Sequence, residues 1–127
     1  MTPMPIDFDT NLKNDYTVAL GYSDENDPSF SYCSNKLDSI NGIDDYTNAW
    51  LSNCGMHGGA SGGPWLVDMD DAGVGTIVSL SSWGYSSSTG VAGPSLRTES
   101  GSFAECLFEK AKNATDPGSV GGYIVDC

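Results

Sequence analysis

The stretch CGMHGGASGGPW, residues 54–65, decides how this sequence is read, because it sets one serine among glycines. Glycine permits sharp turns and leaves backbone N–H groups uncovered by side chains. A serine that attacks a carbonyl creates an oxyanion, which fixed N–H donors beside the serine stabilise. The spacing therefore predicts a nucleophile at Ser61, with the N–H groups of Gly59 and Ser61 pointing into one small hole. A glycine-rich loop without chemistry is the alternative interpretation.

The composition indicates one acidic domain. The chain has 127 residues, enough for one core, and 39% of them are hydrophobic. Five Lys and Arg residues stand against 17 Asp and Glu residues, which gives a net charge of −12. Such a surface repels phosphate backbones and anionic lipids, so we expect neither nucleic-acid nor membrane partners. No run approaches the ~18 apolar residues of a membrane span, and the first residues, MTPMPIDFDTN, do not resemble a signal peptide.

The four cysteines indicate an oxidising compartment, either secreted or in an organelle lumen. No C-x-x-C pair is present, so we expect no structural zinc, and we expect no other metal or cofactor. Of the three possible pairings we favour Cys33–Cys54 and Cys106–Cys127; four reduced thiols are the alternative. Asn113 begins the N-glycosylation sequon NAT and is a candidate modification site.

Apolar runs and turn residues predict short strands. The acidic turn between two of these runs is not a calcium loop: counted from Asp68, an EF-hand would need a ligand where Ala72 stands and Glu where Ser79 stands. Residues 34–53 are polar and are predicted to be mostly loop. The expected strands are 15–22, one that starts within 30–33, a hairpin of 64–70 and 73–85, and 91–96 with Pro94 at an edge or bulge.

One helix is predicted, over residues 100–113. Ser100 or Ser102 can cap it, and Glu105 follows Ser102 at the spacing of a capping box. Residues 114–127 are expected to form a tail held by the second disulfide. Apolar residues recur at helical spacing, so one face is expected to pack on the strands: Phe103, Cys106, Leu107 and Ala111.

Three features together resemble the chymotrypsin/trypsin-fold serine peptidases. They are GGASGGPW, the segment GTIVSLSSWGY about 20 residues downstream, and a helix after VAGPSL. The form C-x-M-x-G-G-x-S-G-G-P-W is similar to the V8-like, or glutamyl-endopeptidase-like, branch. The likeness runs from about residue 15 to residue 112. It implies an all-β fold with a single antiparallel Greek-key β-barrel over 15–99, the second barrel of a trypsin-like fold, and one C-terminal α-helix. Residues 1–127 would be one domain, with 1–14 as an N-terminal extension.

The resemblance also assigns roles to residues. Ser61 would be the nucleophile, and the N–H groups of Gly59 and Ser61 would form the oxyanion hole. Ser82, Trp83 and Gly84 would pair with an extended peptide or protein substrate. Gly55 would lie near the base of the side-chain pocket, where the absence of Asp gives no support for an Arg or Lys preference.

The base and acid of a catalytic triad are missing from this pattern. In the family they come from an upstream barrel, whereas His57 is the only histidine here and precedes Ser61 by four residues on the same loop. We expect His57 to be a bystander and the chain alone to be inactive.

Three hypotheses follow. In the first, the chain is the C-terminal barrel of a secreted or lumenal serine endopeptidase, completed by a missing segment or a second chain that packs on an exposed apolar face. It is instead a non-catalytic homologue whose exposed face is covered by another protein. Or it is a small hydrolase that uses a Ser61–His57 dyad.

Overall fold

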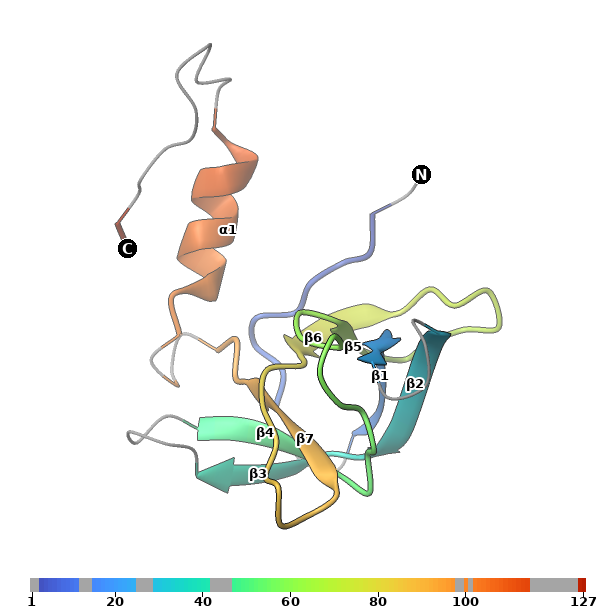
Figure 1. The fold of residues 1–127 in the computed structure, drawn as a ribbon. Coiled ribbons are helices and arrows are strands. Elements are labelled where there is room, and N and C mark those ends of the chain that lie inside the picture. Colours follow the sequence, from blue (N-terminus) through green and yellow to red (C-terminus); the bar gives the residue numbers. More distant parts are fainter. Residues whose placement is uncertain are drawn as a thin grey trace.

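The computed structural model describes residues 3–11, 15–24, 29–41, 47–97, 100, 102–114 and 126–127. Short strands dominate this part of the chain, and one helix follows them (Figure 1). No helix within these residues has the length and apolar character needed to cross a membrane. The elements are β1 (Tyr16–Ser23), β2 (Ser29–Lys36), β3 (Asp38–Asn41), β4 (Thr47–Ser52), β5 (Pro64–Val67), β6 (Thr76–Leu80), β7 (Gly90–Pro94) and α1 (Ala104–Lys112).

The strands form one antiparallel barrel, as predicted. One sheet has the order β2-β1-β5-β6 and the other has the order β3-β4-β7. Leu37 alone separates β2 from β3, so this strand pair bends from one sheet into the other. On the opposite side, the bridge between Trp83 and Ala92 joins the chain after β6 to β7. The two sheets thereby enclose a common core.

The core is small and is filled from both sheets. In β1 the alternate residues Thr17 and Ala19 are buried, while Tyr16 and Tyr22 on the other face are exposed. Trp65 is the largest fully buried side chain, and its indole N–H donates to Ser81 Oγ at 3.0 Å. The buried cluster consists of Ala19, Leu37, Ala49, Leu51, Cys54, Trp65, Val78 and Val91.

The predicted hairpin is present as β5 and β6, with a bulge between Trp65 and Leu66. Asp70 Oδ1 accepts hydrogen bonds from the N–H groups of Ala72 and Val74, both at 2.9 Å, and this network orders the turn. The far edge of β6 is not free, because Ile6 forms a parallel bridge with Ile77. Part of the N-terminal extension therefore adds to the sheet.

The prediction that residues 34–53 are mostly loop is wrong. β2 continues to Lys36, and β3 and β4 are paired strands. In β4, Ala49 and Leu51 are buried in the core, and the alternate residues Asn48, Trp50 and Ser52 are partly exposed. This alternation is that of a half-buried strand, but the polar neighbours conceal it. The predicted strand over 73–85 is likewise shorter in the structure, where β6 covers only Thr76–Leu80.

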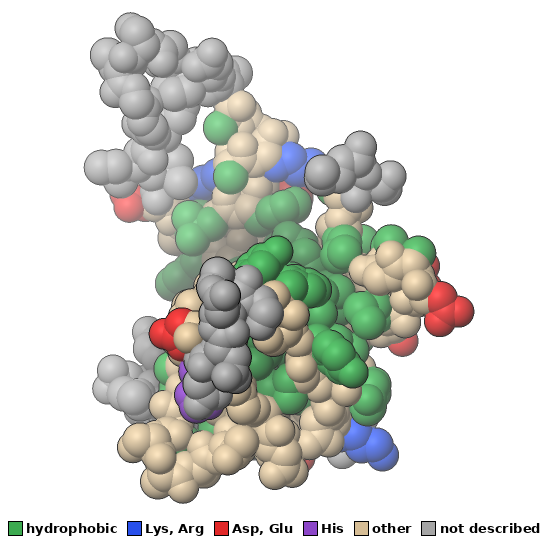
Figure 2. Space-filling view, turned by 45° about the vertical axis from the view of Figure 1, so that its right-hand side comes forward, with side chains coloured by type: hydrophobic (Ala, Val, Ile, Leu, Met, Phe, Trp, Pro, Cys, Tyr) green, Lys and Arg blue, Asp and Glu red, His purple; other side chains and the backbone are tan. Residues whose placement is uncertain are grey.

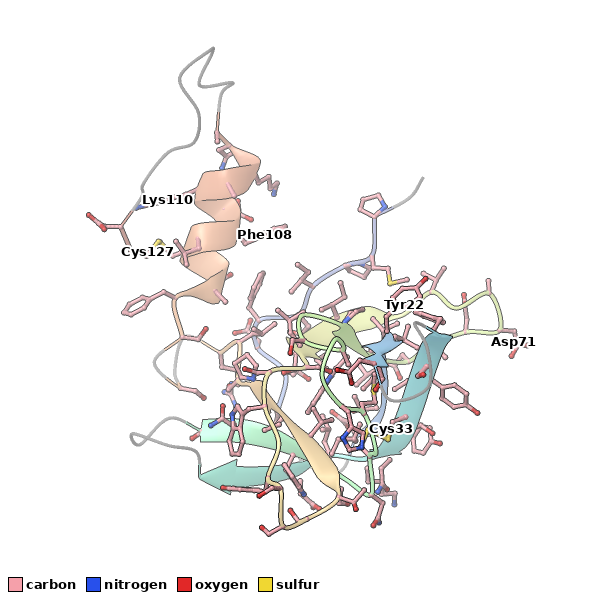
Figure 3. All side chains as sticks on the ribbon, viewed as in Figure 1. Tyr22, Cys33, Asp71, Phe108, Lys110 and Cys127 are labelled. Carbon is pink, nitrogen blue, oxygen red and sulfur yellow. A yellow bond between two sulfur atoms is a disulfide. The ribbon has the colours of Figure 1, made fainter. Side chains whose placement is uncertain are left out.

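The helix is present but does not pack as predicted. It begins at Ala104, and its N-cap residue Phe103 makes no side-chain cap, but Ser102 Oγ accepts from the Ala104 N–H at 3.1 Å. None of its residues is buried, so the expected apolar face on the barrel is absent. Phe108 contacts Phe8 of the N-terminal segment, and Cys127 lies on the other side of α1 (Figure 3). The helix thus stands beside the barrel (Figure 1).

Candidate active site

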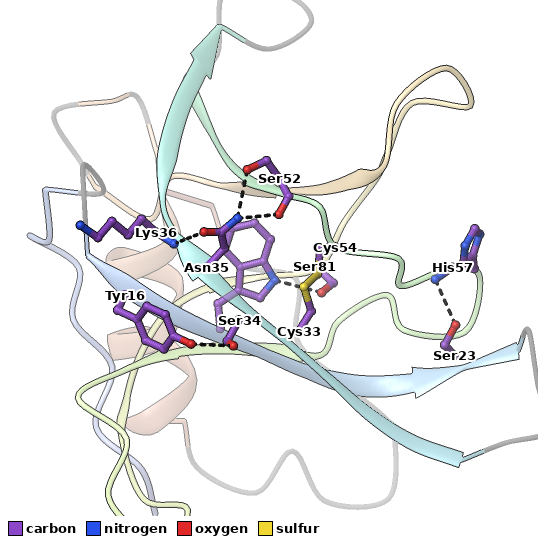
Figure 4. The surroundings of a disulfide bond; sticks show 11 residues. Tyr16, Ser23, Cys33, Ser34, Asn35, Lys36, Ser52, Cys54, His57 and Ser81 are labelled. Carbon is purple, nitrogen blue, oxygen red and sulfur yellow. Dashed lines mark hydrogen bonds between the residues drawn. A yellow bond between two sulfur atoms is a disulfide. The ribbon is translucent and has the colours of Figure 1, made fainter.

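The site is built on the loop that connects β4 to β5, residues 53–63. Cys54 is buried at the start of the loop and is joined to Cys33 of β2 (Figure 4). Just before it, the Asn35 side-chain amide donates to the Ser52 carbonyl oxygen at 3.0 Å. The loop is therefore tied to β2 where it leaves β4. The second disulfide, Cys106–Cys127, lies away from this site, and both pairs are those that we favoured from the sequence.

The C-terminal end of β1 holds the middle of the loop. Ser23 Oγ accepts a hydrogen bond from the His57 N–H at 3.0 Å, and the Asp24 N–H donates to the Gly58 carbonyl oxygen at 2.8 Å. Gly59 has φ +89°, and a Cβ at this position would lie 2.8 Å from the Tyr22 carbonyl oxygen. Only glycine fits such a close approach with this backbone conformation.

Hydrogen bonds around Ser61 leave two N–H groups unused. The Ala60 N–H donates to the His57 oxygen at 3.3 Å, and the N–H groups of Gly62 and Gly63 donate to Ser81 and Ala60 oxygens at 2.8 and 3.0 Å. Within the described residues, the N–H groups of Gly59 and Ser61 donate to no other group. An oxyanion hole requires unused donors of this kind beside the nucleophile.

Ser61 is exposed at the edge of a cavity of about 620 Å³. The cavity lies between the loop of Ser61 and the chain that runs from the end of β6 to the start of β7. It brings together Gly55, Ser61, Ser82, Trp83 and Gly84, which are far apart in the sequence. Gly59 is not among the lining residues. The lining is Cys54–Gly58, Ala60, Ser61 and residues 81–91.

The segment Ser82–Gly84 has one paired edge. The N–H groups of Ser82 and Trp83 both donate to the Ala92 oxygen, at 2.9 and 3.3 Å, and the Ala92 N–H donates to the Trp83 oxygen at 2.6 Å. The Ser82 carbonyl and both backbone groups of Gly84 make no hydrogen bond within the described residues, so these groups are available to pair with a peptide.

Three aromatic rings form a cluster beside the cavity, which the sequence analysis did not anticipate. Trp50 of β4 lies 6.5 Å from Trp83 and 5.7 Å from Tyr85 between ring centroids. Trp83 and Tyr85 meet edge to face at 4.9 Å. Trp50 lies within residues 34–53, which we expected to be mostly loop. The signal that could have revealed it is an aromatic residue within an alternating strand pattern.

His57 is exposed, and its side chain points outward from the loop (Figure 4). In the described part of the chain, no hydrogen bond joins it to the Ser61 hydroxyl. The same residues contain no group of three or more His, Cys, Asp or Glu side chains that could hold a metal ion. Asn113 is exposed at the C-terminal end of α1, and its glycosylation stays a prediction.

Comparison with solved structures agrees with this architecture. The chain is similar to a thermostable serine protease, AL20, from an extremophilic microorganism, with a TM-score of 0.70 and 24% identity over 90% of this chain. It is also similar to the protease Anisep from Arthrobacter nicotinovorans, with a TM-score of 0.59 and 23% identity over 81% of this chain. These matches cover 50% and 48% of the two protease chains, so this chain spans about half their length.

At this identity the likeness establishes the fold, which is that of one trypsin-like β-barrel. No protein-family model and no curated protein sequence matches the chain.

Proposed function

We propose that this chain is the C-terminal barrel of a secreted or lumenal serine endopeptidase of the V8-like branch, with Ser61 as its nucleophile. One observation carries the proposal: the exposed Ser61 stands at the edge of a cavity, beside two backbone donors that the loop leaves unused. The two disulfides are compatible with an oxidising compartment.

In the proposed reaction, Ser61 Oγ attacks the carbonyl carbon of a peptide bond. The carbonyl oxygen becomes an oxyanion, which the N–H groups of Gly59 and Ser61 stabilise. The substrate lies extended along Ser82–Gly84, and backbone hydrogen bonds to this edge hold the scissile bond at Ser61. The side chain of the residue that supplies the carbonyl enters the cavity.

Ser61 also needs a base to remove its proton, and a group that orients the base. We propose that His57 is not this base, because it precedes Ser61 by four residues on the same loop and makes no hydrogen bond to Ser61 within the described residues. We propose that the His and the Asp come from another segment or another chain. The chain spans about half of the two similar proteases, which supports this division.

The second candidate is a non-catalytic homologue that acts as a subunit of a larger complex. An exposed aromatic face is compatible with it, as it is with a face on which the missing barrel of an endopeptidase packs. On the outer face of β1 and β2, Tyr22 packs on Phe30 at 5.3 Å between ring centroids, and Tyr32 is 73% exposed. Figure 2 shows hydrophobic side chains gathered across the middle of one face of the molecule. Such a face is typical of a surface that another protein covers.

A fluorophosphonate probe separates the two candidates when it is applied to the protein as isolated from its native source, with any partner retained. Labelling at Ser61 that is lost in Ser61→Ala supports the endopeptidase. If Ser61 stays unlabelled in the intact assembly while an added trypsin standard reacts, the result supports the non-catalytic subunit and contradicts the serine endopeptidase. We expect the purified chain alone to stay unlabelled, and its reaction would instead establish a self-contained hydrolase.

A further inference from the structure

We infer that the outer face of β1 and β2 is the docking surface for the protein domain that supplies the base to Ser61. We call this surface the aromatic face and define it by Leu20, Tyr22, Phe30 and Tyr32. The inference rests on the proposed function, because it takes from that proposal that Ser61 receives its base from another segment or chain. It goes further by naming where on this chain that domain packs.

The aromatic face is continuous. The register of β1 and β2 sets Tyr22 opposite Phe30 and Leu20 opposite Tyr32, and residues opposite each other share one face of a sheet. The three rings are 58%, 60% and 73% exposed, and Tyr16 at the far end of β1 is 61% exposed. Four rings of this exposure present about 500 Å² of aromatic surface. Because a stable interface buries about 800 Å² on each partner, this surface has the size of an interface centre.

The outer face of the same sheet buries apolar side chains next to the N-terminal segment. Val18 of β1 and Leu66 of β5 pair with each other and are both buried. Their neighbours Ala19 and Trp65 belong to the core cluster, so Val18 and Leu66 point to the outer face instead. There they line a second cavity together with Asp7 of the N-terminal segment. This outer face is therefore a packing surface, and the aromatic face continues it on the side of β2.

One end of the aromatic face is attached to the loop of Ser61. A Cβ at Gly59 would lie 2.8 Å from the Tyr22 carbonyl oxygen, and the next residue, Ser23, accepts from the His57 N–H (Figure 4). A domain that covers Tyr22 therefore borders this loop. A base has to come within about 2.6–3.2 Å of the hydroxyl that it deprotonates, so a domain that carries one has to be held close to Ser61.

The charge of the aromatic face indicates what covers it. Among the described residues that β1 and β2 place on this face there is no Asp or Glu, although the chain has a net charge of −12. At the far end, Lys36 and the hydrogen bond from Tyr16 O–H to Ser34 Oγ provide a polar rim. Two copies of so acidic a chain repel each other. The occupant that we assign is therefore a different, less acidic domain with an apolar surface.

The similar proteases support an occupant of domain size. This chain matches 50% and 48% of their lengths, so each contains a further part of comparable length. The other exposed apolar surface lies on α1, where Phe103, Leu107 and Phe108 are 62%, 43% and 39% exposed. The helix, however, stands beside the barrel and contacts Phe8 of the N-terminal segment. It is the alternative docking surface.

Tyrosine modification tests the inference on the protein as isolated from its native source, with any partner retained. N-acetylimidazole acetylates exposed tyrosine hydroxyls, and mass spectrometry compares the rate at each tyrosine between the native assembly and the purified chain of residues 1–127. We expect Tyr22 and Tyr32 to react at least about tenfold more slowly in the assembly, because the centre of an interface is fully buried. Tyr85, which lies beside the cavity and is 50% exposed, is the internal control and should react equally in both.

Two results of this experiment contradict the inference. Equal rates at Tyr22 and Tyr32 in the assembly and in the purified chain overturn it. Protection of the same tyrosines in the purified chain alone, rising with its concentration, would identify a second copy as the occupant and would also overturn it.

Tyr32→Glu places a charge in the proposed interface. In the native assembly it should lower the rate of fluorophosphonate labelling at Ser61 by at least about tenfold. The urea midpoint of the purified chain should stay unchanged, because Tyr32 is exposed there. Val74→Glu is the matched control on the hairpin turn, where Val74 is 49% exposed, and should leave the labelling rate unchanged.

Two patterns among these variants contradict the inference. Equal losses of labelling in Tyr32→Glu and Val74→Glu would show an effect of long-range charge and would overturn it. A loss in Phe103→Glu without a loss in Tyr32→Glu would place the docking surface on α1 and would overturn it as well.

The inference and the proposed function can fail separately. If Ser61 is labelled in the native assembly while Tyr22 and Tyr32 react as fast as in the purified chain, the endopeptidase stands and the docking surface falls. If the two tyrosines are protected but Ser61 stays unlabelled, the aromatic face docks the partner of a non-catalytic subunit, and the proposed function falls.

Discussion

Ser23 Oγ accepts a hydrogen bond from the His57 N–H at 3.0 Å, although the two residues are 34 positions apart. Together with the bond from the Asp24 N–H to the Gly58 oxygen, this contact fixes the loop of Ser61 to the end of β1. The position of the proposed oxyanion donors thus depends on a strand that lies far from them in the sequence.

Ser23→Ala should release this contact. Ser23 is buried, so the His57 N–H loses its acceptor in a place where water reaches poorly, and the free energy of unfolding should fall by about 1 kcal/mol. Urea denaturation measures the loss, and amide hydrogen exchange should accelerate at His57 and Gly58. Ser34→Ala is the matched control: its hydroxyl accepts from the exposed Tyr16 O–H at 2.8 Å, and its loss should change stability by less than about 0.5 kcal/mol. Equal losses in both variants would contradict this prediction.

Gly59→Ala should be tolerated poorly. Its φ of +89° is unfavourable for alanine, and the added Cβ would lie 2.8 Å from the Tyr22 oxygen. We expect a loss of about 1–3 kcal/mol in the free energy of unfolding, and loss of any fluorophosphonate labelling at Ser61.

Gly55→Ala is the control for Gly59→Ala, because its Cβ meets no atom within 4 Å and stability should stay within about 0.5 kcal/mol. If both alanine variants kept wild-type stability, the loop would not be held at Gly59 as the structure has it.

Substitution by alanine should affect the stability of the protein differently at two adjacent serines. Ser81 is buried and accepts the indole N–H of Trp65 at 3.0 Å, so Ser81→Ala leaves a buried donor without an acceptor and should destabilise by about 1–3 kcal/mol. Ser82 is exposed, and Ser82→Ala should be nearly neutral. Thermal unfolding followed by tryptophan fluorescence distinguishes the two. A neutral Ser81→Ala would mean that the Trp65 N–H finds another acceptor.

The local features of this fold could be predicted from the sequence. The hairpin of β5 and β6 carries apolar runs on both sides of an acidic turn, and the loop of Ser61 carries its glycines within one short motif. The cavity also brings together Gly55 and Ser82–Gly84, to which the resemblance assigned substrate contacts, and those roles stay predictions. Each of these features depends either on residues that lie close together in the sequence or on the motif spacing that carries the resemblance.

The remaining features depend on distant contacts. β4 has only Ala49 and Leu51 as buried apolar residues, and its pairing with β3 and β7 makes it a strand. The hydrogen bond from the His57 N–H to Ser23 Oγ joins residues 34 positions apart, so no local sequence pattern predicts it. The apolar spacing of α1 correctly indicated a helix, but periodicity cannot specify which surface a helix meets, and here its residues stay exposed.

The two disulfides should differ in their effect on the barrel, although each joins cysteines 21 positions apart. For a loop of this length, the chain-entropy model assigns about 3 kcal/mol to either cross-link. Cys33–Cys54 joins β2 to the buried start of the Ser61 loop, so the double variant Cys33→Ala/Cys54→Ala should lose at least that amount. Cys106–Cys127 instead constrains α1, none of whose residues is buried. Its double alanine variant should therefore change barrel unfolding by less than about 1 kcal/mol. Urea denaturation followed by tryptophan fluorescence reports on the barrel, which holds Trp50, Trp65 and Trp83, and far-UV circular dichroism reports on the helix. Equal losses in the fluorescence transition would show that α1 unfolds together with the barrel.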